Sequence, residues 1–266
     1  MSTLDTALRI VPRLHMPRSW RLVERNIASS RGAWLVFVSG FFEPLFYLLA
    51  LGVGVGRLVG TVELDGQVVS YREFVAPALL AASAMNGAVY ESGNVFFKLK
   101  YAKTYDGVLA TPMTVRDVAA GELTYTLLRG AVYSVGFVTV MVALGLVDSP
   151  WAVLAVPGSL LVSAAFAAPS VFGTTLMRSW ADFAFVELCT LPMFLFSATF
   201  VPADEYPDVV RWLLPLTPLY HGVQLLRAFT LGDVGWVVLV HAGYLAALAG
   251  VFFVLADRRL GRLLRK

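Results

Sequence analysis

The chain has 266 residues, of which 58% are hydrophobic and only 15% are charged, and its mean hydropathy is +0.72. Soluble domains are about half apolar and about a quarter charged, so this composition excludes a soluble globular domain, a disordered chain and a disulfide scaffold. The net charge of +3 would suit a nucleic-acid-binding protein. The cations lie beside hydrophobic segments, however, so we expect membrane lipids as partners and no nucleic acid.

Residues 1–33 predict a cytoplasmic, amphipathic region that lies on the membrane surface. After Pro17, the apolar residues Trp20, Val23 and Ile27 recur at helical spacing among several arginines. A basic amphipathic helix that carries a tryptophan is typical of the membrane interface. A solvated tail is the alternative.

Residues 34–256 predict an all-α integral membrane domain, because six apolar segments are each long enough to cross a hydrocarbon core of about 30 Å. These spans are expected at about 34–56, 74–97, 118–147, 151–177, 183–200 and 234–256. With both termini in the cytoplasm, sixteen of the 21 Lys and Arg residues lie on the inner side and four on the outer side. This bias predicts that orientation, with a basic cytoplasmic tail at 257–266.

The loop between the second and third spans, residues 98–117, predicts a short helix with an apolar, aromatic side that faces the cytoplasm. Thr104 can cap this helix and Pro112 ends it. Tyr101, Tyr105 and the neighbouring apolar residues would form the exposed side. A connector needs no such surface, so we expect it to bind a soluble partner. Anchoring of these aromatic rings at the membrane interface is the alternative.

The segment 201–233 is apolar but interrupted by prolines, and neither of its apolar pieces is long enough to span a membrane. Such pieces are typical of re-entrant or interfacial helices. We expect two external half-helices between spans five and six that enter the outer leaflet and return. The alternative, a seventh span, would place the basic tail outside, which the charge bias disfavours.

Several charged residues lie in or near the expected spans, where each costs roughly 2.5–3.5 kcal/mol at mid-membrane. They are Glu43, Glu91, Glu122, Arg129 and Glu187. We expect them to face a protein interior or a wet cavity, where they line or gate a substrate path; structural pairing is the alternative. Glu122 and Arg129 lie about 10.5 Å apart along one helix. They are therefore too distant to pair directly, and either could pair with Glu91, Glu43 or a neighbouring subunit.

Motifs for nucleotide and metal chemistry are missing from the sequence. No glycine is followed by lysine, so there is no Walker A motif. One cysteine and three scattered histidines do not form a structural metal site. We therefore expect no catalytic residue, no metal and no cofactor on this chain, and any pump would need its energy from another subunit.

Two stretches carry a resemblance to a known family. One runs from Tyr105 to Pro112 and continues from Asp117 to Leu123; the other runs from Phe200 to Pro202 and continues from Leu214 to His221. With nearly the whole chain, they resemble the ABC-2 type permeases, above all the nodulation-factor exporter and daunorubicin-type exporter branch. The resemblance implies that the first stretch is a coupling helix that docks on an ATPase, with Tyr101, Thr104, Tyr105, Asp106, Gly107, Val108, Leu109 and Thr111. It implies that the second is the external re-entrant pair, with Pro202, Trp212, Pro215, Pro218, Tyr220, His221 and Arg227.

The resemblance also implies partners and a function. It implies a permease subunit of a bacterial inner-membrane exporter, without a nucleotide site of its own. Two copies, or one copy and a paralogous permease, would assemble with two separate ATP-binding subunits that hold ATP and Mg. The substrate would be amphipathic, lipid-linked or drug-like, and would leave the cytoplasm or the inner leaflet. The alternatives are an ion-coupled secondary transporter that uses the intramembrane carboxylates, and a non-transporting assembly factor or anchor.

Overall fold

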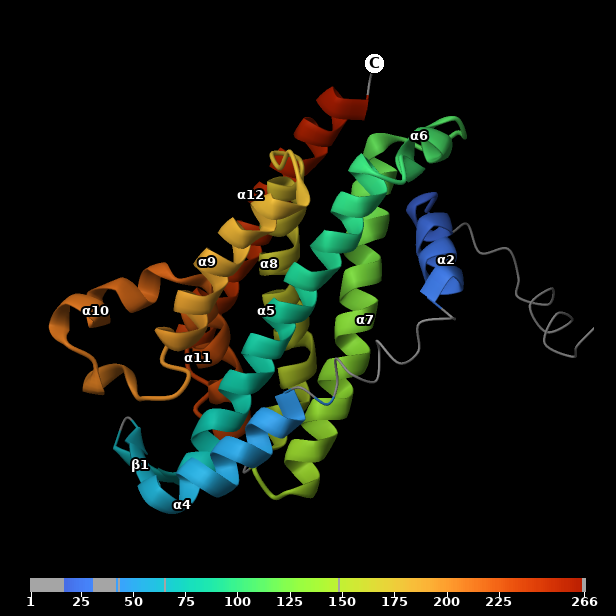
Figure 1. Ribbon diagram of the computed structural model, residues 1–266. Coiled ribbons are helices and arrows are strands. Elements are labelled where there is room, and N and C mark those ends of the chain that lie inside the picture. The colour runs from blue at the N-terminus through green and yellow to red at the C-terminus, as the bar shows by residue number, and fades with distance from the viewer. Residues whose placement is uncertain (1–16, 31–41, 43, 65, 148, 265–266) are drawn as a thin grey trace, which may run out of the picture.

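A computed structural model describes residues 17–30, 42, 44–64, 66–147 and 149–264. The chain forms a helical bundle, with α6 and the C-terminal end of the chain at one end and β1 and α4 at the other (Figure 1). The long helices are α5 (Tyr71–Lys100), α7 (Val115–Ala143), α8 (Ala155–Thr174) and α12 (Val237–Leu264). The shorter helices are α2 (Ser19–Ser30), α4 (Gly56–Val59), α6 (Thr104–Leu109), α9 (Phe183–Leu195), α10 (Asp208–Leu213) and α11 (Pro218–Leu231).

Within the described residues, three helical segments are long and apolar enough to cross a membrane. They are α7, the continuous segment Pro150–Thr174 that joins η3 (Pro150–Leu154) to α8, and α12. These match the third, fourth and sixth expected spans. The second expected span forms the 30-residue helix α5, whereas α9 has only 13 residues. The total of six spans therefore stays a prediction.

The first expected span lies partly outside the described residues. Its described part is a shorter apolar helical segment, Pro44–Val59, which includes the π-helical stretch η2 (Ala50–Val55). The antiparallel hairpin of β1 (Thr61–Leu64) and β2 (Gln67–Ser70) follows. This hairpin was not among the predicted elements, because four-residue strands are too short to give a clear alternating pattern.

The core of the bundle surrounds α8, which packs against α5, α7, α11 and α12. Small residues let these helices approach closely. A Cβ atom added at Gly222 of α11 would lie 2.9 Å from Cγ2 of Val162 on α8, so a side chain there would force the two helices apart. Close packing of helix backbones at small residues is typical of membrane bundles.

The segment between the fifth and sixth expected spans contains two helices, α10 and α11, preceded by η5 (Ala203–Glu205) and joined by η6 (Leu214–Leu216). The 14 residues of α11 reach about 21 Å at 1.5 Å per residue, less than a membrane crossing. α10 projects away from the bundle (Figure 1). The predicted tail 257–266 is not a separate segment up to Leu264, because α12 continues through it as helix.

Candidate functional site

Helices α2, α5, α6 and α7 meet around one buried carboxylate, Glu122, whose residue is 1% exposed. The Nζ atom of Lys98 lies 2.9 and 3.0 Å from its two oxygens. The Nδ2 atom of Asn26 and the hydroxyl of Tyr105 each donate a hydrogen bond of 3.0 Å to it. These four residues, Asn26, Lys98, Tyr105 and Glu122, form what we call the Glu122 junction. It joins four elements through one charge.

The junction is held by charge-assisted contacts in a place that excludes most water. The side chain of Lys98 is 18% exposed and that of Glu122 is 2% exposed. Burial, and next the negative charge of Glu122, raise the pKa of the Tyr105 phenol well above its ordinary value. The phenol therefore stays protonated and remains a donor. Removal of one partner from such a set is costly, because it leaves the others desolvated without compensation.

The local sequence explains how α6 places Tyr105. Lys103 precedes the helix with a left-handed φ of 47°, which turns the chain sharply after α5. Thr104 is the first helical residue and does not act as the cap that the sequence suggested. The helix ends at Leu109, before Pro112 as expected, and a capping box of Thr114 and Asp117 starts α7. The turn thus directs α6 back over the ends of α5 and α7.

The expectation that Tyr105 lies on an exposed docking side is wrong. Its side chain points into the junction and is 1% exposed, because Glu122 offers an acceptor below α6. The exposed residues of the coupling segment are Tyr101, Asp106, Gly107 and Thr111, whereas Thr104, Val108 and Leu109 are half-buried. The structure therefore brings the predicted coupling residues together on one short helix and the turns beside it. The side that faces outward differs from the predicted one, because Asp106 and Gly107 are exposed in place of Tyr105.

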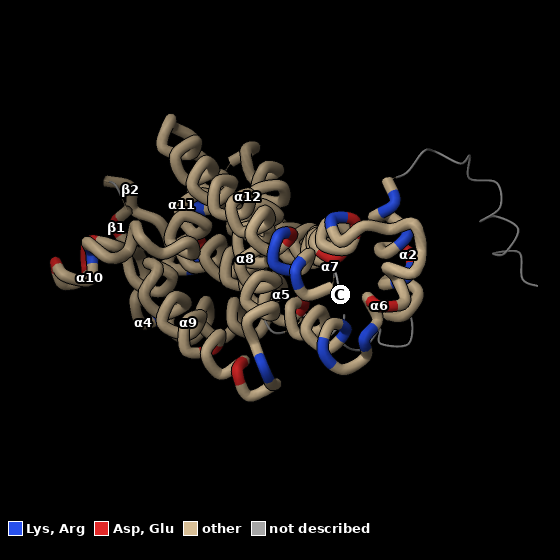
Figure 2. The backbone as a smooth tube through the Cα atoms, turned by 90° about the horizontal axis from the view of Figure 1, so that it is seen from above, with Lys and Arg blue, Asp and Glu red and all other residues tan. Residues whose placement is uncertain are grey.

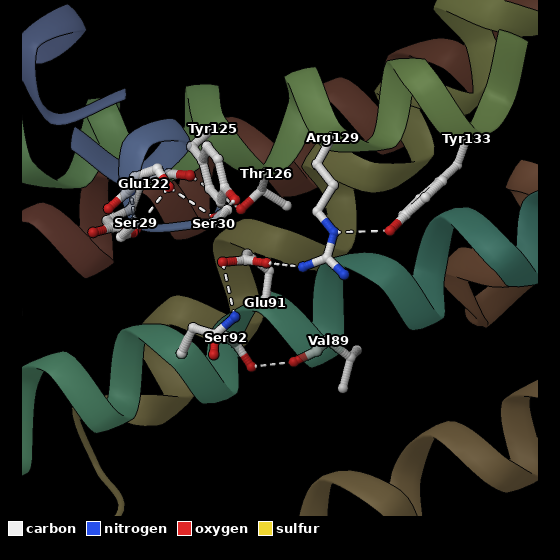
Figure 3. Close-up of polar contacts among 12 residues, drawn as sticks. Ser29, Ser30, Val89, Glu91, Ser92, Glu122, Tyr125, Thr126, Arg129 and Tyr133 are labelled. Atoms are coloured by element: carbon white, nitrogen blue, oxygen red, sulfur yellow. Dashed lines mark hydrogen bonds and ion pairs between the residues drawn. The ribbon is translucent and has the colours of Figure 1, made fainter. Parts of the chain in front are cut away.

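A second ion pair joins α5 and α7 deeper in the bundle. The Nη1 atom of Arg129 lies 2.6 Å from Oε2 of Glu91, and the Nε atom of Arg129 donates to the Tyr133 hydroxyl at 3.1 Å. Figure 3 shows Arg129 and Glu91 pointing toward one another from the two helices. The pairing of Arg129 with Glu91 is one of the pairings that the sequence left open. A small polar cavity, lined by Glu91, Thr126, Arg129 and neighbouring serines, adjoins it.

Of the two remaining predicted path residues, Glu187 is the one that the structure describes. Glu187 lies exposed on α9, and no residue of α9 is buried. Glu43 lies outside the described residues. The three described carboxylates, Glu91, Glu122 and Glu187, therefore do not form a single cluster. Two of them take part in ion pairs between helices, as the structural alternative predicted.

The segment between α9 and α12, which was expected to be external, contains a buried cation and one member of a histidine pair. Arg227 of α11 donates to the carbonyl oxygens of Ala198 at 3.0 Å and Phe74 at 3.3 Å, and lies over the Phe74 ring. His221 lies 2.8 Å from His241 of α12, Nδ1 to Nδ1. These contacts fix α11 against the bundle.

The other predicted residues of the segment between α9 and α12 have simpler surroundings. The carbonyl of Pro215 lies 2.8 Å from Nε2 of His221, and the Tyr220 hydroxyl accepts from Gln224. Trp212 of α10 is 81% exposed. Pro202 directly precedes η5. Pro218 is the first residue of α11, a position where a missing N–H costs nothing.

Sequence reasoning missed Asn26 and Lys98 as site residues. The sequence placed Trp20, Val23 and Ile27 on one apolar side of the interfacial helix, toward the membrane. Within the protein, α2 buries Leu22, Val23 and Asn26 and leaves Ile27 exposed. A usable signal was present for Lys98. Glu91 precedes Lys98 by seven residues on α5, and Glu122 precedes Arg129 by seven residues on α7. Because the two helices run in opposite directions, the same order of charge on each places unlike charges side by side.

Long apolar helices with ion pairs buried between them define a polytopic membrane protein. The profile of the ABC-2 type transporter family matches residues 18–231. The chain is 30% identical over 246 residues to nodulation protein J of Rhizobium meliloti (strain 1021), and 31% identical over 246 residues to that of Rhizobium leguminosarum bv. trifolii. Each alignment covers 91% of both chains. The chain belongs to the ABC-2 type transporter family and is a membrane transport component of the ABC exporter class.

Proposed function

We propose that this chain is the permease subunit of an ATP-driven exporter in a bacterial inner membrane, with both termini in the cytoplasm. In this proposal α6 and the turn after it dock on a separate ABC ATP-binding subunit that holds ATP and Mg. The substrate is amphipathic, lipid-linked or drug-like, as the resemblance to nodulation-factor and daunorubicin-type exporters implies. It leaves the cytoplasm or the inner leaflet.

The observation that supports this proposal best is the Glu122 junction. A docking helix that drives transport must pass its displacement to the spans. α6 has only six residues, so by itself it could not pass a displacement on to the long helices. The hydrogen bond from Tyr105 to Glu122 ties it to α7, and the Lys98 ion pair ties that contact to α5. A displacement of α6 therefore has to move α5 and α7, or break the buried hydrogen bond between Tyr105 and Glu122.

The exposed side of α6 supports the same proposal. Asp106 and Gly107 are exposed there, and Tyr101 is 56% exposed beside them. An exposed tyrosine next to a rigid short helix is a frequent feature of protein interfaces, where Tyr, Trp and Arg supply much of the binding energy. The partner would contact this side without disturbing the buried Tyr105.

The stoichiometry in the proposal is two permease copies, or this chain and a paralogue, with two ATP-binding subunits. The exposed helix α9 supports a second permease copy. Phe185, Leu188 and Leu191 are each at least 60% exposed on it, and apolar residues exposed in this way would lie against lipid or against another transmembrane helix. A two-fold dimer would bury the same surface on both copies.

The ion-coupled transporter would require carboxylates that are free to take up and release protons. Glu91 is instead paired with Arg129, and Glu122 with Lys98. No contact in the described structure favours that alternative.

The test is recovery of an ATP-binding subunit from native membranes with tagged permease. We compare the wild type with Asp106→Arg on exposed α6, and use Asp233→Arg, an exposed aspartate at the far end of α11, as the matched charge reversal. A wrong charge at an interface costs several kcal/mol, so Asp106→Arg should lower recovery and stimulated ATP hydrolysis about tenfold or more. Asp233→Arg should leave both unchanged.

Equal recovery with Asp106→Arg and Asp233→Arg would contradict docking through α6. A wild-type permease that purifies alone after gentle extraction would contradict the ATP-driven proposal itself. Proton-driven transport in liposomes would then be the next measurement.

A further inference from the structure

A groove between α2 and α6 separates these two elements on their exposed side. Its volume is about 780 Å³, which is in the range of small-molecule binding sites. Figure 2 shows the Lys and Arg positions that gather over α2 and α6 at this end of the molecule. Gly107 and Thr111 of the proposed docking segment border this groove, whereas Tyr101 and Asp106 do not line it.

The residues that line the groove are of two kinds. Four are cations and none is acidic: Arg18, Arg21, Arg25 and Lys103. Between them lie apolar groups, of which Leu22 is fully buried, together with Val108, Pro112 and Met113. The site thus offers positive charge at its rim and an apolar floor, which suits a ligand with a negative head and an apolar body.

The groove has a fixed geometry. The Nη1 atom of Arg18 donates to the carbonyl oxygen of Pro112 at 2.9 Å, which joins the start of α2 to the turn after α6. Arg21 pairs with Glu24 on the same helix at 3.1 Å; both side chains are exposed to solvent, so this pair is weak and leaves Arg21 available. Arg25 and Lys103 are exposed beside it.

The depth of the groove points to lipid. Crossing about 30 Å takes about 20 helical residues, and counted back from Ala143, where α7 ends, these reach Thr124. Ser19 and Leu22 of α2 pack on Gly121, and Asn26 binds Glu122. α2 therefore meets α7 just outside the hydrocarbon region, at the level of the inner-leaflet phosphates.

We propose that the groove between α2 and α6 is a binding site for an anionic phospholipid of the inner leaflet. The lipid phosphate lies among Arg21, Arg25 and Lys103, and the glycerol and upper acyl region lie on Leu22, Val108 and Met113. The bound lipid supports α6 from its membrane side and leaves Asp106 exposed for the ATPase. This site goes beyond the proposed function, and its test uses the permease alone.

The experiment places purified full-length permease in nanodiscs of phosphatidylcholine with a minority of phosphatidylglycerol that carries a photoreactive headgroup. After irradiation, labelled peptides are identified by mass spectrometry. The test variant is Arg21→Gln/Arg25→Gln/Lys103→Gln. The matched control, Arg116→Gln/Arg258→Gln/Arg262→Gln, removes three exposed cations at the same end of the protein but outside the groove.

We expect labelling of peptides from residues 18–25 and 103–113 in the wild type. Each basic residue near an anionic surface contributes about 1 kcal/mol, so loss of three should lower this labelling by at least about tenfold. The control should retain it, and a photoreactive phosphatidylcholine probe should label these peptides weakly in all three proteins. Circular dichroism checks that both variants remain folded.

Three outcomes would overturn the proposal. An equal loss of labelling in both triple variants would mean that basic residues attract the lipid to the protein surface in general, without a specific site in the groove. Unchanged labelling in the groove variant would mean that lipid does not occupy the groove, even if that variant also recovers less ATPase. Competition by soluble glycerol phosphate to the same extent as by phosphatidylglycerol would mean a site for free phosphate groups instead of lipid.

Discussion

The ion pair of Lys98 and Glu122 allows a test of how the junction is built. We compare Lys98→Met, Glu122→Gln and the double variant. Each single change leaves one charge in a desolvated place, and breaking a buried pair in this way costs about 3–5 kcal/mol. Because Lys98 keeps 18% of its side chain exposed, and Glu122 keeps the donors of Asn26 and Tyr105, we expect the lower end, about 3 kcal/mol for each.

The double variant should cost less than the sum of the two. It removes both charges together, and the glutamine still offers one oxygen as an acceptor for Asn26 or Tyr105. The remaining loss is about one or two hydrogen bonds, or roughly 1–3 kcal/mol. The coupling free energy between the two positions should therefore be about 3 kcal/mol or more, as for residues that share one network.

The assay is thermal unfolding of the purified permease in detergent, followed by tryptophan fluorescence at one fixed heating rate, since unfolding of such proteins is often irreversible. A cost of 3 kcal/mol should lower Tm by roughly 6–12 °C. The control is the exposed pair of Arg21 and Glu24, where Arg21→Met and Glu24→Gln should each cost under about 1 kcal/mol. Additive costs for Lys98→Met and Glu122→Gln would refute the junction as a coupled unit.

Two further predictions concern helix contacts. A Cβ atom at Gly121 would lie 2.8 Å from the carbonyl oxygen of Ser19 and 2.9 Å from Cβ of Leu22, so Gly121→Ala should cost about 1–3 kcal/mol and speed tryptic cleavage in α2. A Cβ atom at Gly243 would meet open space, so Gly243→Ala should neither destabilise the protein nor speed this cleavage. Equal rates of cleavage in the Gly121→Ala and Gly243→Ala variants would contradict the packing of α2 on α7. Cys189 is the single cysteine of the chain and lies exposed on α9, so oxidation should join two copies if α9 forms the dimer contact. Cross-linking of a Cys189→Ser/Val132→Cys variant, but not of the wild type, would place the contact on α7 instead.

Sequence reasoning predicted the long helices well where apolar character alone determines them. The third and fourth expected spans, 118–147 and 151–177, match α7 and Pro150–Thr174 closely, because a long apolar run has few alternatives to a helix. The fifth was expected to reach residue 200, but α9 ends at Leu195. Hydropathy cannot predict this end of the helix, because the residues after Leu195 remain apolar although their backbone is no longer helical.

The candidate site was harder to predict, because its contacts join distant segments. The pattern of α6 showed that Tyr105 lies on an apolar side, but not whether that side faces the cytoplasm or the bundle. The answer depends on Glu122, 17 residues away, and on Asn26, 96 residues from Glu122. By contrast, the distance between Arg129 and Glu122 on a single helix excluded a direct pair between them, and it left the pairing of Arg129 with Glu91 as one of the possibilities that the sequence named.

The two ion pairs together fix how α5 and α7 align. Along α5, Glu91 precedes Lys98 by seven residues, and along the returning helix α7, Glu122 precedes Arg129 by seven. A slip of two turns would place Lys98 beside Arg129 or Glu91 beside Glu122. Each slipped arrangement sets like charges against one another where little water can screen them. Because Tyr105 binds to one of these same carboxylates, the position of α6 depends on the register between the two helices. A displacement of α6 should therefore move α5 and α7 as one unit rather than slide them past each other.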